Sequence, residues 1–397
     1  MVLLIAIIYN IGMLFAFKYF NLFNNVTRDL LAGIGIPFSP IILQIILPIG
    51  ISFYTFQSLG YVIDVYRGRK AERHLGILAT FVAFFPTVLA GPIERADNLI
   101  PQLKKRIVIK KENLRIGIGL FVWGLFLKVV IADRLAIVVN TIYGSPLEYT
   151  GIPLLLATFF FTFQIYIDFA AYSLMAIGSA KMLGIKIMDN FRRPYLSKSI
   201  TEFWHRWHIS LSTWFRDYLY IPLGGSRVSV PRWYFNLLIV FVVSGLWHGA
   251  GITFAIWGFI HGIIIVFEKI PKGRMQKLWR IPNYFKIIIT FVVVSFAWIF
   301  FRANNFGEAV YIIGNLFVGI GKDLSFVNLG GIGGIFGVLL ALVLILGLLI
   351  VEILREKKLI EFEKFSWKTK FLLFLIAIEA ILFLGVNSGT QFIYFSF

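Results

Sequence analysis

Two of the five histidines in this sequence, His208 and His248, stand where an imidazole could carry out chemistry. His248 lies in the stretch SGLWHGAG, a predicted turn between two short apolar segments, 234–248 and 252–267. Helices of ~15 residues rise ~22 Å, less than the ~30 Å of a hydrocarbon core, so we expect this turn below the membrane surface. At that depth a neutral imidazole is a natural general base. A buried histidine bonded to a carbonyl is the alternative that position alone leaves open.

Three glycines surround that turn, Gly245, Gly249 and Gly251. They predict that the backbone bends there and approaches a ligand closely.

His208 lies in a second unusual segment, 199–220, which is predicted to form one amphipathic helix. Ser199 and Glu202 have the spacing of a capping box at its start. At helical spacing, His208 falls at the border between an apolar face and a polar arc. Periodicity alone favours an interfacial helix with aromatic anchors over a catalytic element. The apolar face holds Ile200, Phe203, Trp204, Trp207, Leu211, Trp214, Phe215 and Tyr218, and the polar arc holds Glu202, His205, Arg206, Ser212, Thr213 and Arg216.

The other three histidines have simpler interpretations. His74 is expected to be solvated, His205 to lie on a surface and His261 to serve packing. The pair His205-x-x-His208 has no third ligand nearby, so no metal site is predicted. The absence of cysteine excludes disulfides, thiolate catalysis and cysteine–zinc sites.

Asp168, in FQIYIDFAAYS, is a carboxylate inside an apolar segment. Such acids face the interior of a bundle, where Asp168 would orient a histidine, pair with an arginine or lie on a proton route. Structural pairing and direct catalysis are equally open. Gln164, Tyr166 and Tyr172 add hydrogen-bonding capacity beside it.

A third group of charged residues lies near helix-breaking positions. Glu94 and Arg95 follow Gly91-Pro92, and Arg192, Arg193, Arg216 and Arg227 flank the segment 199–220. These arginines would attract a phosphorylated donor such as coenzyme A or a carrier phosphopantetheine. The preference for positive charge in cytoplasmic loops explains any single arginine equally well.

The elements that must position these residues are membrane helices. Of the 397 residues 59% are hydrophobic and 15% charged, too few charges for a soluble domain. Most of the 38 Lys and Arg lie in short loops, which indicates topology rather than nucleic-acid binding and places the N-terminus inside and the C-terminus outside. Spans are predicted near 1–17, 39–61, 114–142, 151–180, 234–248, 252–267, 285–301, 330–351 and 371–386.

Segment 75–93 has basic residues on both sides and is broken by Pro86, Gly91 and Pro92. It is therefore predicted to be re-entrant, entering and leaving the membrane on one face. The predicted fold class is all-α: a polytopic transmembrane bundle of about 9–11 membrane segments. It contains this re-entrant element and an amphipathic in-membrane helix, in a single domain over 1–397.

Several motifs together resemble the membrane-bound O-acyltransferase (MBOAT) family, and most of all its alginate O-acetyltransferase branch. These motifs are FFPTVLAGPIER, QIYIDFAAYSLMAIG, ITEFWHRWHISLSTWFRDYLYIPLGG, SGLWHG and FIYFSF. They stand in the family's order over nearly the whole chain. Two departures exist. The chain looks short before the region matching Met1–Phe20, and Leu174 replaces an acid in a stretch that is closer to the D-alanyl transferase branch.

The resemblance implies a tunnel through the bundle, with the family's two signature histidines at His208 and His248. It implies an acetyl-CoA or carrier-bound acyl thioester as co-substrate and no metal. The partners implied are the lipid bilayer, a polysaccharide or cell-wall polymer acceptor and an extracytoplasmic acetylase, with no nucleic acid, in the cell membrane. Supporting roles are assigned to Asp168, Gln164, Tyr166, Trp247, Trp207, Arg206, Arg216 and Asp217, and donor binding to Glu94, Arg95, Arg192 and Arg193.

Three functions remain open at this stage. The first is an O-acetyltransferase in which His248 removes the proton of the acceptor hydroxyl, while His208 orients the donor or stabilises developing charge. The second is D-alanyl transfer to teichoic acid. The third is a transporter or flippase, since buried ionisable groups and re-entrant backbone also occur in transporters, although no internal repeat is evident.

Overall fold

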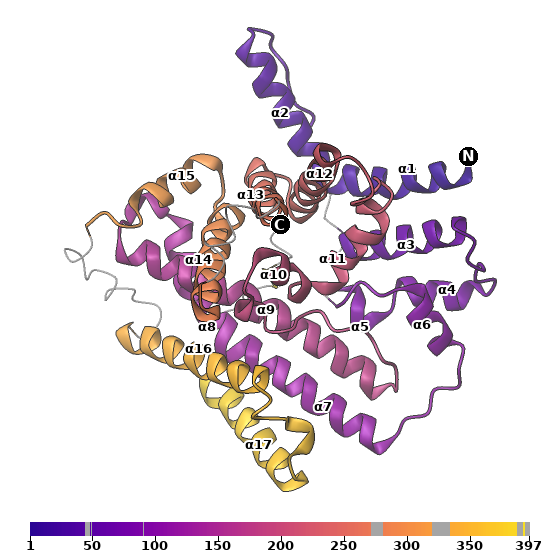
Figure 1. Cartoon of the computed structure of the whole chain (residues 1–397), viewed down its shortest axis with the longest axis vertical. Coiled ribbons are helices and arrows are strands. Elements are labelled where there is room, and N and C mark those ends of the chain that lie inside the picture. Colours follow the sequence, from indigo (N-terminus) through magenta and orange to yellow (C-terminus); the bar gives the residue numbers. More distant parts are fainter. Residues whose placement is uncertain are drawn as a thin grey trace.

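The computed structural model describes residues 1–43, 48, 50–89, 91–270, 281–319, 334–386 and 392–393, and within these ranges it is helical with no β-strand (Figure 1). The helices of the first half are α1 Val2–Leu14, α2 Phe20–Gly33, α3 Ile51–Tyr66, α4 Leu75–Val82, α5 Phe85–Val88, α6 Ala96–Leu103, α7 Lys111–Phe126, α8 Asp133–Gly144 and α9 Ile152–Met182. Those of the second half are α10 Ile200–Arg206, α11 Ile209–Phe215, α12 Val230–His248, α13 Ile252–Lys269, α14 Asn283–Arg302, α15 Phe306–Asn315, α16 Gly334–Glu356 and α17 Trp367–Leu384.

Seven helical runs within the described residues are long and apolar enough to cross a membrane, which confirms the predicted polytopic all-α class. They are Val2–Gly33, Lys111–Gly144, Ile152–Met182, Val230–His248, Ile252–Lys269, Asn283–Arg302 and Gly334–Glu356. The spans predicted at 39–61 and 371–386 are not among them. The described helix in the first is only Ile51–Tyr66, with residues 44–47 and 49 outside the described part, and α17 carries several charged residues.

Two predicted boundaries were wrong. The loop expected from residue 18 is instead a π-helical turn, Phe15–Tyr19, that leads directly into α2. Figure 1 shows α2 extending away from the rest of the bundle. The segments around His248 are also longer than predicted, at 19 residues for α12 and 18 for α13. At 1.5 Å per residue these helices rise about 28 and 27 Å, close to the thickness of the hydrocarbon core.

The broken segment near residue 86 is confirmed as two short helices. α4 ends at Val82, and α5 begins at Phe85 with Pro86 in its first turn, where the missing amide of proline is harmless. Gly50, at the start of α3, lies against this segment with φ of +78°, and a Cβ there would meet the carbonyl oxygen of Val88 at 2.1 Å. Only glycine fits that position.

Helix α9 is the central column of the bundle, with α7 lying alongside it (Figure 1). Most of its side chains are buried, and α5, α8 and α14 also pack against it. A π-helical turn, Leu127–Ala132, joins α7 to α8 and faces α9.

That turn places Lys128 inside the bundle, where its Nζ lies 2.7 Å from Asp133 and 2.7 Å from Asp168. The second oxygen of Asp168 accepts a hydrogen bond of 2.9 Å from the backbone N–H of Ile393. Asp168 is therefore paired with a lysine. The predicted partners were an arginine or a histidine. This buried cluster ties α7, α8 and α9 to the end of the chain.

We predict that Lys128→Met destabilises the protein, because it leaves two buried carboxylates without their cation. Removing one partner of a buried ion pair costs about 3–5 kcal/mol. Thermal unfolding in detergent would measure the loss. Lys110→Met, at an exposed lysine just before α7, is the matched control. Equal unfolding temperatures for the two variants would contradict the prediction.

Candidate active site

His208 stands at a sharp break between two short helices, and not inside one continuous helix as predicted. α10 ends at Arg206 and α11 begins at Ile209, with His208 in the left-handed region at φ of +41°. Residues other than glycine adopt this conformation only when the surrounding structure enforces it. The break turns the imidazole inward, so His208 is completely buried and does not lie at the border of an amphipathic face. Ser199 does cap α10, accepting a 3.0 Å hydrogen bond from the N–H of Glu202.

Asn190 holds this break in place. Its backbone carbonyl accepts from the N–H of Ile209 at 2.9 Å. Its side-chain Oδ1 accepts from the N–H of Ser210 at 3.3 Å, from the hydroxyl of Ser210 at 2.9 Å, and lies 3.0 Å from Nδ1 of His208. Its Nδ2 donates to the hydroxyl of Ser173 on α9 at 3.1 Å.

These contacts fix the tautomer of His208. Because the backbone N–H of Ser210 can only donate, the Asn190 atom that faces it is the oxygen, and Nδ1 of His208 must then carry the proton. Burial also lowers the pKa of His208 from its ordinary value of 6.5 and so keeps the ring neutral. Nε2 therefore presents its lone pair to the interior, where it has no hydrogen-bond partner among the described residues.

His248 is the last residue of α12 and is also buried, at 2% exposure. Its ring is enclosed by aromatic side chains, with centroid distances of 4.9 Å to Trp247, 5.2 Å to Trp257 and 5.3 Å to Phe301.

The glycines near His248 serve helix packing, which differs from the predicted approach to a ligand. A Cβ on Gly245 would meet the carbonyl oxygen of Phe254 at 2.1 Å, and one on Gly249 would meet the Phe254 ring at 2.1 Å. Gly249 and Gly251 are extended, with no positive φ. Gly245 and Gly249 let α12 and α13 touch closely, so His248 lies against Trp257 of α13 and Phe301 of α14, whereas a Cβ on Gly251 would meet only ordinary contacts.

The two imidazoles are neighbours inside the bundle, with ring centroids 6.4 Å apart. Trp247 lies beside both rings, 6.2 Å from His208, and its buried indole N–H has no acceptor among the described residues. The site thus offers two nitrogen bases and a hydrogen-bond donor in a desolvated place.

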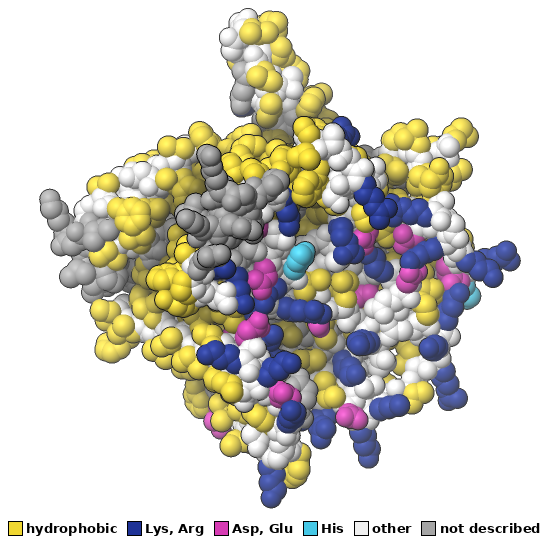
Figure 2. Space-filling view, viewed as in Figure 1, with side chains coloured by type: hydrophobic (Ala, Val, Ile, Leu, Met, Phe, Trp, Pro, Cys, Tyr) yellow, Lys and Arg dark blue, Asp and Glu magenta, His cyan; other side chains and the backbone are white. Residues whose placement is uncertain are grey.

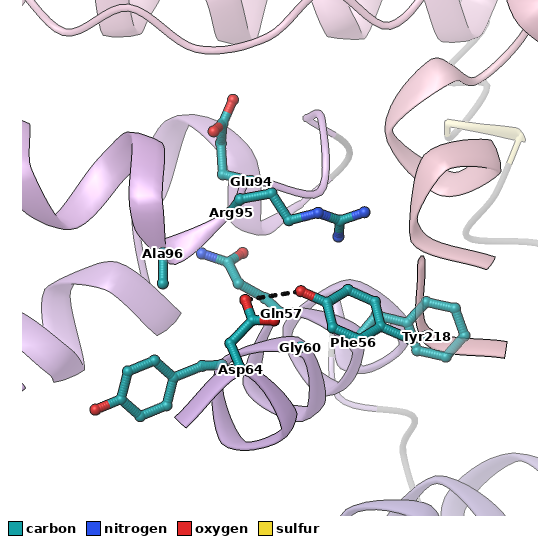
Figure 3. A pocket seen from close by; sticks show the side chains of 9 residues that line it. Phe56, Gln57, Gly60, Asp64, Glu94, Arg95, Ala96 and Tyr218 are labelled. Carbon is teal, nitrogen blue, oxygen red and sulfur yellow. Dashed lines mark hydrogen bonds between the residues drawn. The ribbon is translucent and has the colours of Figure 1, made fainter. Parts of the chain in front are cut away.

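A small recess, without room for a free water molecule, lies between α3, the start of α6 and Tyr218 (Figure 3). Phe56 lines the recess and packs against Trp247 at 5.2 Å. Arg95 and Tyr218 also line it, with the guanidinium 5.0 Å from the phenol ring and 3.6 Å from Asp217. Figure 3 shows the guanidinium reaching across the recess, while Tyr218 donates to Asp64 at 2.8 Å. The remaining lining residues are Gln57, Gly60, Tyr61, Glu94 and Ala96.

A wider groove of about 540 Å³ adjoins the recess and shares Tyr61 and Ala96 with it. Arg69, Lys70 and Lys104 line this groove at the surface, together with Asp97, which pairs with Arg69, and Glu72, which pairs with Lys104. Figure 2 shows Lys and Arg side chains, interleaved with fewer acids, gathered over this side of the molecule. Phe56 lines the recess and packs on Trp247, so these two aromatic side chains separate the recess from the two histidines.

The four residues predicted to bind a donor separate into two places. Arg95 and Glu94 both line the recess, and Glu94 also anchors the surrounding backbone by accepting from Met188 N at 2.5 Å and Asn98 Nδ2 at 2.8 Å. Burial raises the pKa of Glu94 and lowers that of Arg95. Arg192 is exposed and 3.8 Å from Asp189, and Arg193 is paired with Glu356 at 2.6 Å, so neither borders the recess.

Other predicted supporting residues hold elements together. Arg206 pairs with Glu202 at 2.6 Å and Glu356 at 2.9 Å, which ties α10 to α16. Arg216 pairs with its neighbour Asp217 at 2.8 Å. On α9, Gln164 is buried with no partner for its Oε1 among the described residues, and the hydroxyl of Tyr166 donates to Glu352 on α16. Trp207 is completely buried and packs 5.1 Å from Trp298.

The remaining histidines are placed apart from the pair. His74 caps α4 by accepting from Ile77 N at 3.2 Å, His205 is exposed, and His261 accepts from Trp204 Nε1 at 3.3 Å. No cluster of three His, Asp or Glu side chains in the described ranges could hold a metal ion. Beside the histidine pair, sequence reasoning missed Asn190, which carries no local signal because its partner His208 lies 18 positions further along the chain.

A sequence model of the MBOAT, membrane-bound O-acyltransferase, family matches residues 74–307. The chain is 42% identical over 305 residues to a probable alginate O-acetylase, AlgI, of Pseudomonas aeruginosa, which covers 76% of this chain and 58% of that protein. It is 35% identical over 343 residues to a peptidoglycan O-acetyltransferase of Helicobacter pylori, covering 78% of this chain and 63% of that protein.

A teichoic acid D-alanyltransferase of Bacillus subtilis is less similar, at 29% identity over 283 residues, covering 65% of this chain and 69% of that protein. The chain thus spans about three fifths of the length of the two acetyltransferase relatives it matches. The greater identity lies with the acetylase branch, as the YIPLGG and FIYFSF motifs predicted.

We predict that Asn190→Ala lowers the free energy of unfolding by about 2–4 kcal/mol, because Nδ1–H of His208 and N–H of Ser210 lose their buried acceptor. Ser173→Ala is the control, since it removes only the hydroxyl that Asn190 Nδ2 contacts. Thermal unfolding of the purified variants would check this. A loss no larger than that of the control would contradict the assigned network.

Proposed function

The chain belongs to the membrane-bound O-acyltransferase family, and from this premise we propose that it transfers an acetyl group from a cytoplasmic thioester to hydroxyl groups of an extracytoplasmic polysaccharide. The observation that carries the proposal is the pair of buried imidazoles, 6.4 Å apart, packed behind Phe56 and Trp247. Nε2 of His208 and the indole N–H of Trp247 are buried without a partner among the described residues, whereas a purely structural site would satisfy them.

The chemistry follows from general-base catalysis. The acceptor hydroxyl attacks the thioester carbonyl while His248 removes its proton, and a tetrahedral intermediate forms. When the carbon–sulfur bond breaks, the proton passes from His248 to the departing thiolate, which leaves an ester and a free thiol. No net proton enters or leaves the site, so the buried histidine does not need contact with bulk water.

The tautomer of His208 limits the kind of substrate group that its free nitrogen can bind. Because Asn190 accepts from Nδ1, the available Nε2 can only accept a hydrogen bond. His208 is therefore suited to hold an O–H or N–H group of a substrate and not to stabilise a negative charge. The buried indole N–H of Trp247 is suited to the second task, since it can donate to the carbonyl oxygen as charge develops there.

The donor would enter through the groove and the recess. Arg69, Lys70 and Lys104 at the groove suit the phosphates of coenzyme A or of a carrier phosphopantetheine, which would compete with Asp97 and Glu72 for Arg69 and Lys104. The side chains around the recess would move apart to admit the thioester arm. Arg95 would contact the polar part of that arm, because its guanidinium lies within the recess.

The acceptor would approach His248 from the opposite side of the membrane. The relatives are named for acetylation of alginate and of peptidoglycan, so a polysaccharide or cell-wall polymer is the proposed class of acceptor, reached directly or through an extracytoplasmic acetylase. The cell membrane is the proposed location.

We predict that His248→Ala reduces acetyl transfer by roughly 10²–10⁴-fold, the usual contribution of a general base. Membranes carrying the protein would be supplied with radiolabelled acetyl-CoA and polymer, and label in the polymer measured. His205→Ala, at an exposed histidine on α10, should keep full activity. Full transfer by a folded His248→Ala protein would refute the proposal, and transport without transfer by the wild type would favour a flippase.

We also predict that Arg95→Gln raises KM for the thioester donor by about 10-fold, the loss of one hydrogen bond to a charged group, and leaves kcat nearly unchanged. Arg67→Gln is a matched control, because Arg67 also lies over Tyr218, at 5.3 Å, but does not line the recess. Steady-state kinetics with varied donor would separate the two. Equal KM values for both variants would remove the recess from the donor route.

A further inference from the structure

The C-terminal end of α12 leaves three backbone carbonyls to be satisfied. Helices commonly end with a residue in the left-handed conformation, whose amide and the next one bond back to these carbonyls. Here Gly249 is extended at φ of −154°, and its N–H bonds only to Gly245. The carbonyls of Leu246, Trp247 and His248 therefore need donors from elsewhere.

The N-terminal helical segment supplies those donors. Nζ of Lys18 donates to the carbonyl of Trp247 at 2.9 Å and to that of His248 at 2.8 Å. The hydroxyl of Tyr19 donates to the carbonyl of Leu246 at 2.6 Å. Two consecutive side chains thus donate hydrogen bonds to all three carbonyls.

The π-helical turn Phe15–Tyr19 explains how both side chains reach the same helix end. Such turns widen the helix by one residue and are frequent at functional sites. The lysine also suits its position electrostatically, since a positive charge at a helix C-terminus is favourable. A lysine inside a bundle is otherwise expensive, so its retention there indicates a use.

We propose that Lys18 and Tyr19 are positioning residues that hold His248 in its reactive geometry by capping the last turn of α12. The inference rests on the proposed function, in which His248 accepts the acceptor's proton. Without the cap, the last turn of α12 can fray and the imidazole can shift. A displacement of ~1 Å at a catalytic group lowers a rate by ~10²-fold.

The test compares four variants in the full-length protein. Lys18→Met removes the ammonium group, and Lys18→Arg retains a donor that can bridge two carbonyls. Tyr19→Phe removes one hydroxyl. Asn21→Ala is the matched control, because Asn21 lies on the same segment but bonds the backbone of Leu43 at 2.9 Å and not α12.

Acetyl transfer per folded molecule and hydrogen–deuterium exchange of the peptide 243–251 would be measured for each. We expect kcat of Lys18→Met to fall roughly 10–100-fold with KM for acetyl-CoA unchanged. We expect faster exchange at 243–251, near-complete rescue in Lys18→Arg, a smaller loss in Tyr19→Phe, and wild-type values in Asn21→Ala.

Wild-type kcat and exchange in both Lys18→Met and Tyr19→Phe would overturn the inference. So would equal losses in Asn21→Ala, which would reveal a general loosening of the segment. If Lys18→Met does not fold, Tyr19→Phe and Lys18→Arg still decide the question through exchange at 243–251. The proposed function fails separately, through full activity of His248→Ala.

Discussion

Inside a lipid bilayer a polar group cannot form its hydrogen bond with water, so each buried donor, acceptor or charge must find a partner within the protein. Three such pairings organise this bundle. Lys128 joins Asp133 and Asp168 at the central column, Asn190 holds the break at His208, and Lys18 with Tyr19 caps the end of α12. Each links segments far apart in the sequence, and the last two act directly on the backbone that carries a histidine.

The same constraint gives the two histidines different properties. His208 has one nitrogen committed to Asn190, so its chemistry is restricted to accepting a hydrogen bond through Nε2. His248 is held through its backbone, by the cap on α12 and by glycines that bring α13 close. His208 thus offers a hydrogen-bond acceptor in a fixed position, and His248 offers a base in a fixed position beside it. This arrangement suits the transfer of an acyl group between two bound substrates, one from each side of the membrane. Such a reaction depends on orientation more than on any strong acid or base.

Sequence reasoning predicted the helical class, the broken segment near Pro86 and the apolar face of 199–220, although it favoured an interfacial position for that face, which the structure buries. Each of these follows from local pattern, and the structure contains all three. It was wrong about the continuity of that amphipathic helix, because helical periodicity continues across a break when the two pieces bury the same face. The positive φ of His208 leaves no trace in the spacing of apolar residues.

The partners of His208 and of the end of α12 were beyond sequence reasoning for a related reason, whereas the partner of Asp168 was not. Lys128 stands in an apolar segment and was visible as an intramembrane charge, so its pairing with Asp168 was within reach. Lys18 was placed in a loop, since a π-helical turn has no distinct composition. Asn190 is one polar residue among many in a basic loop. Only the folded chain shows which carbonyls Lys18 binds and which imidazole Asn190 binds.

The central claim is that acyl transfer takes place between His208 and His248, and a structure with a bound donor analogue tests it most directly. We would determine the structure of the protein in lipid nanodiscs with a non-hydrolysable acetyl-CoA analogue. The account predicts the analogue's carbonyl carbon between the two rings, with its oxygen near the indole of Trp247 and an imidazole nitrogen within about 3.5 Å. An acetyl group that remains in the outer groove, or occupies a cavity remote from both histidines, would contradict it.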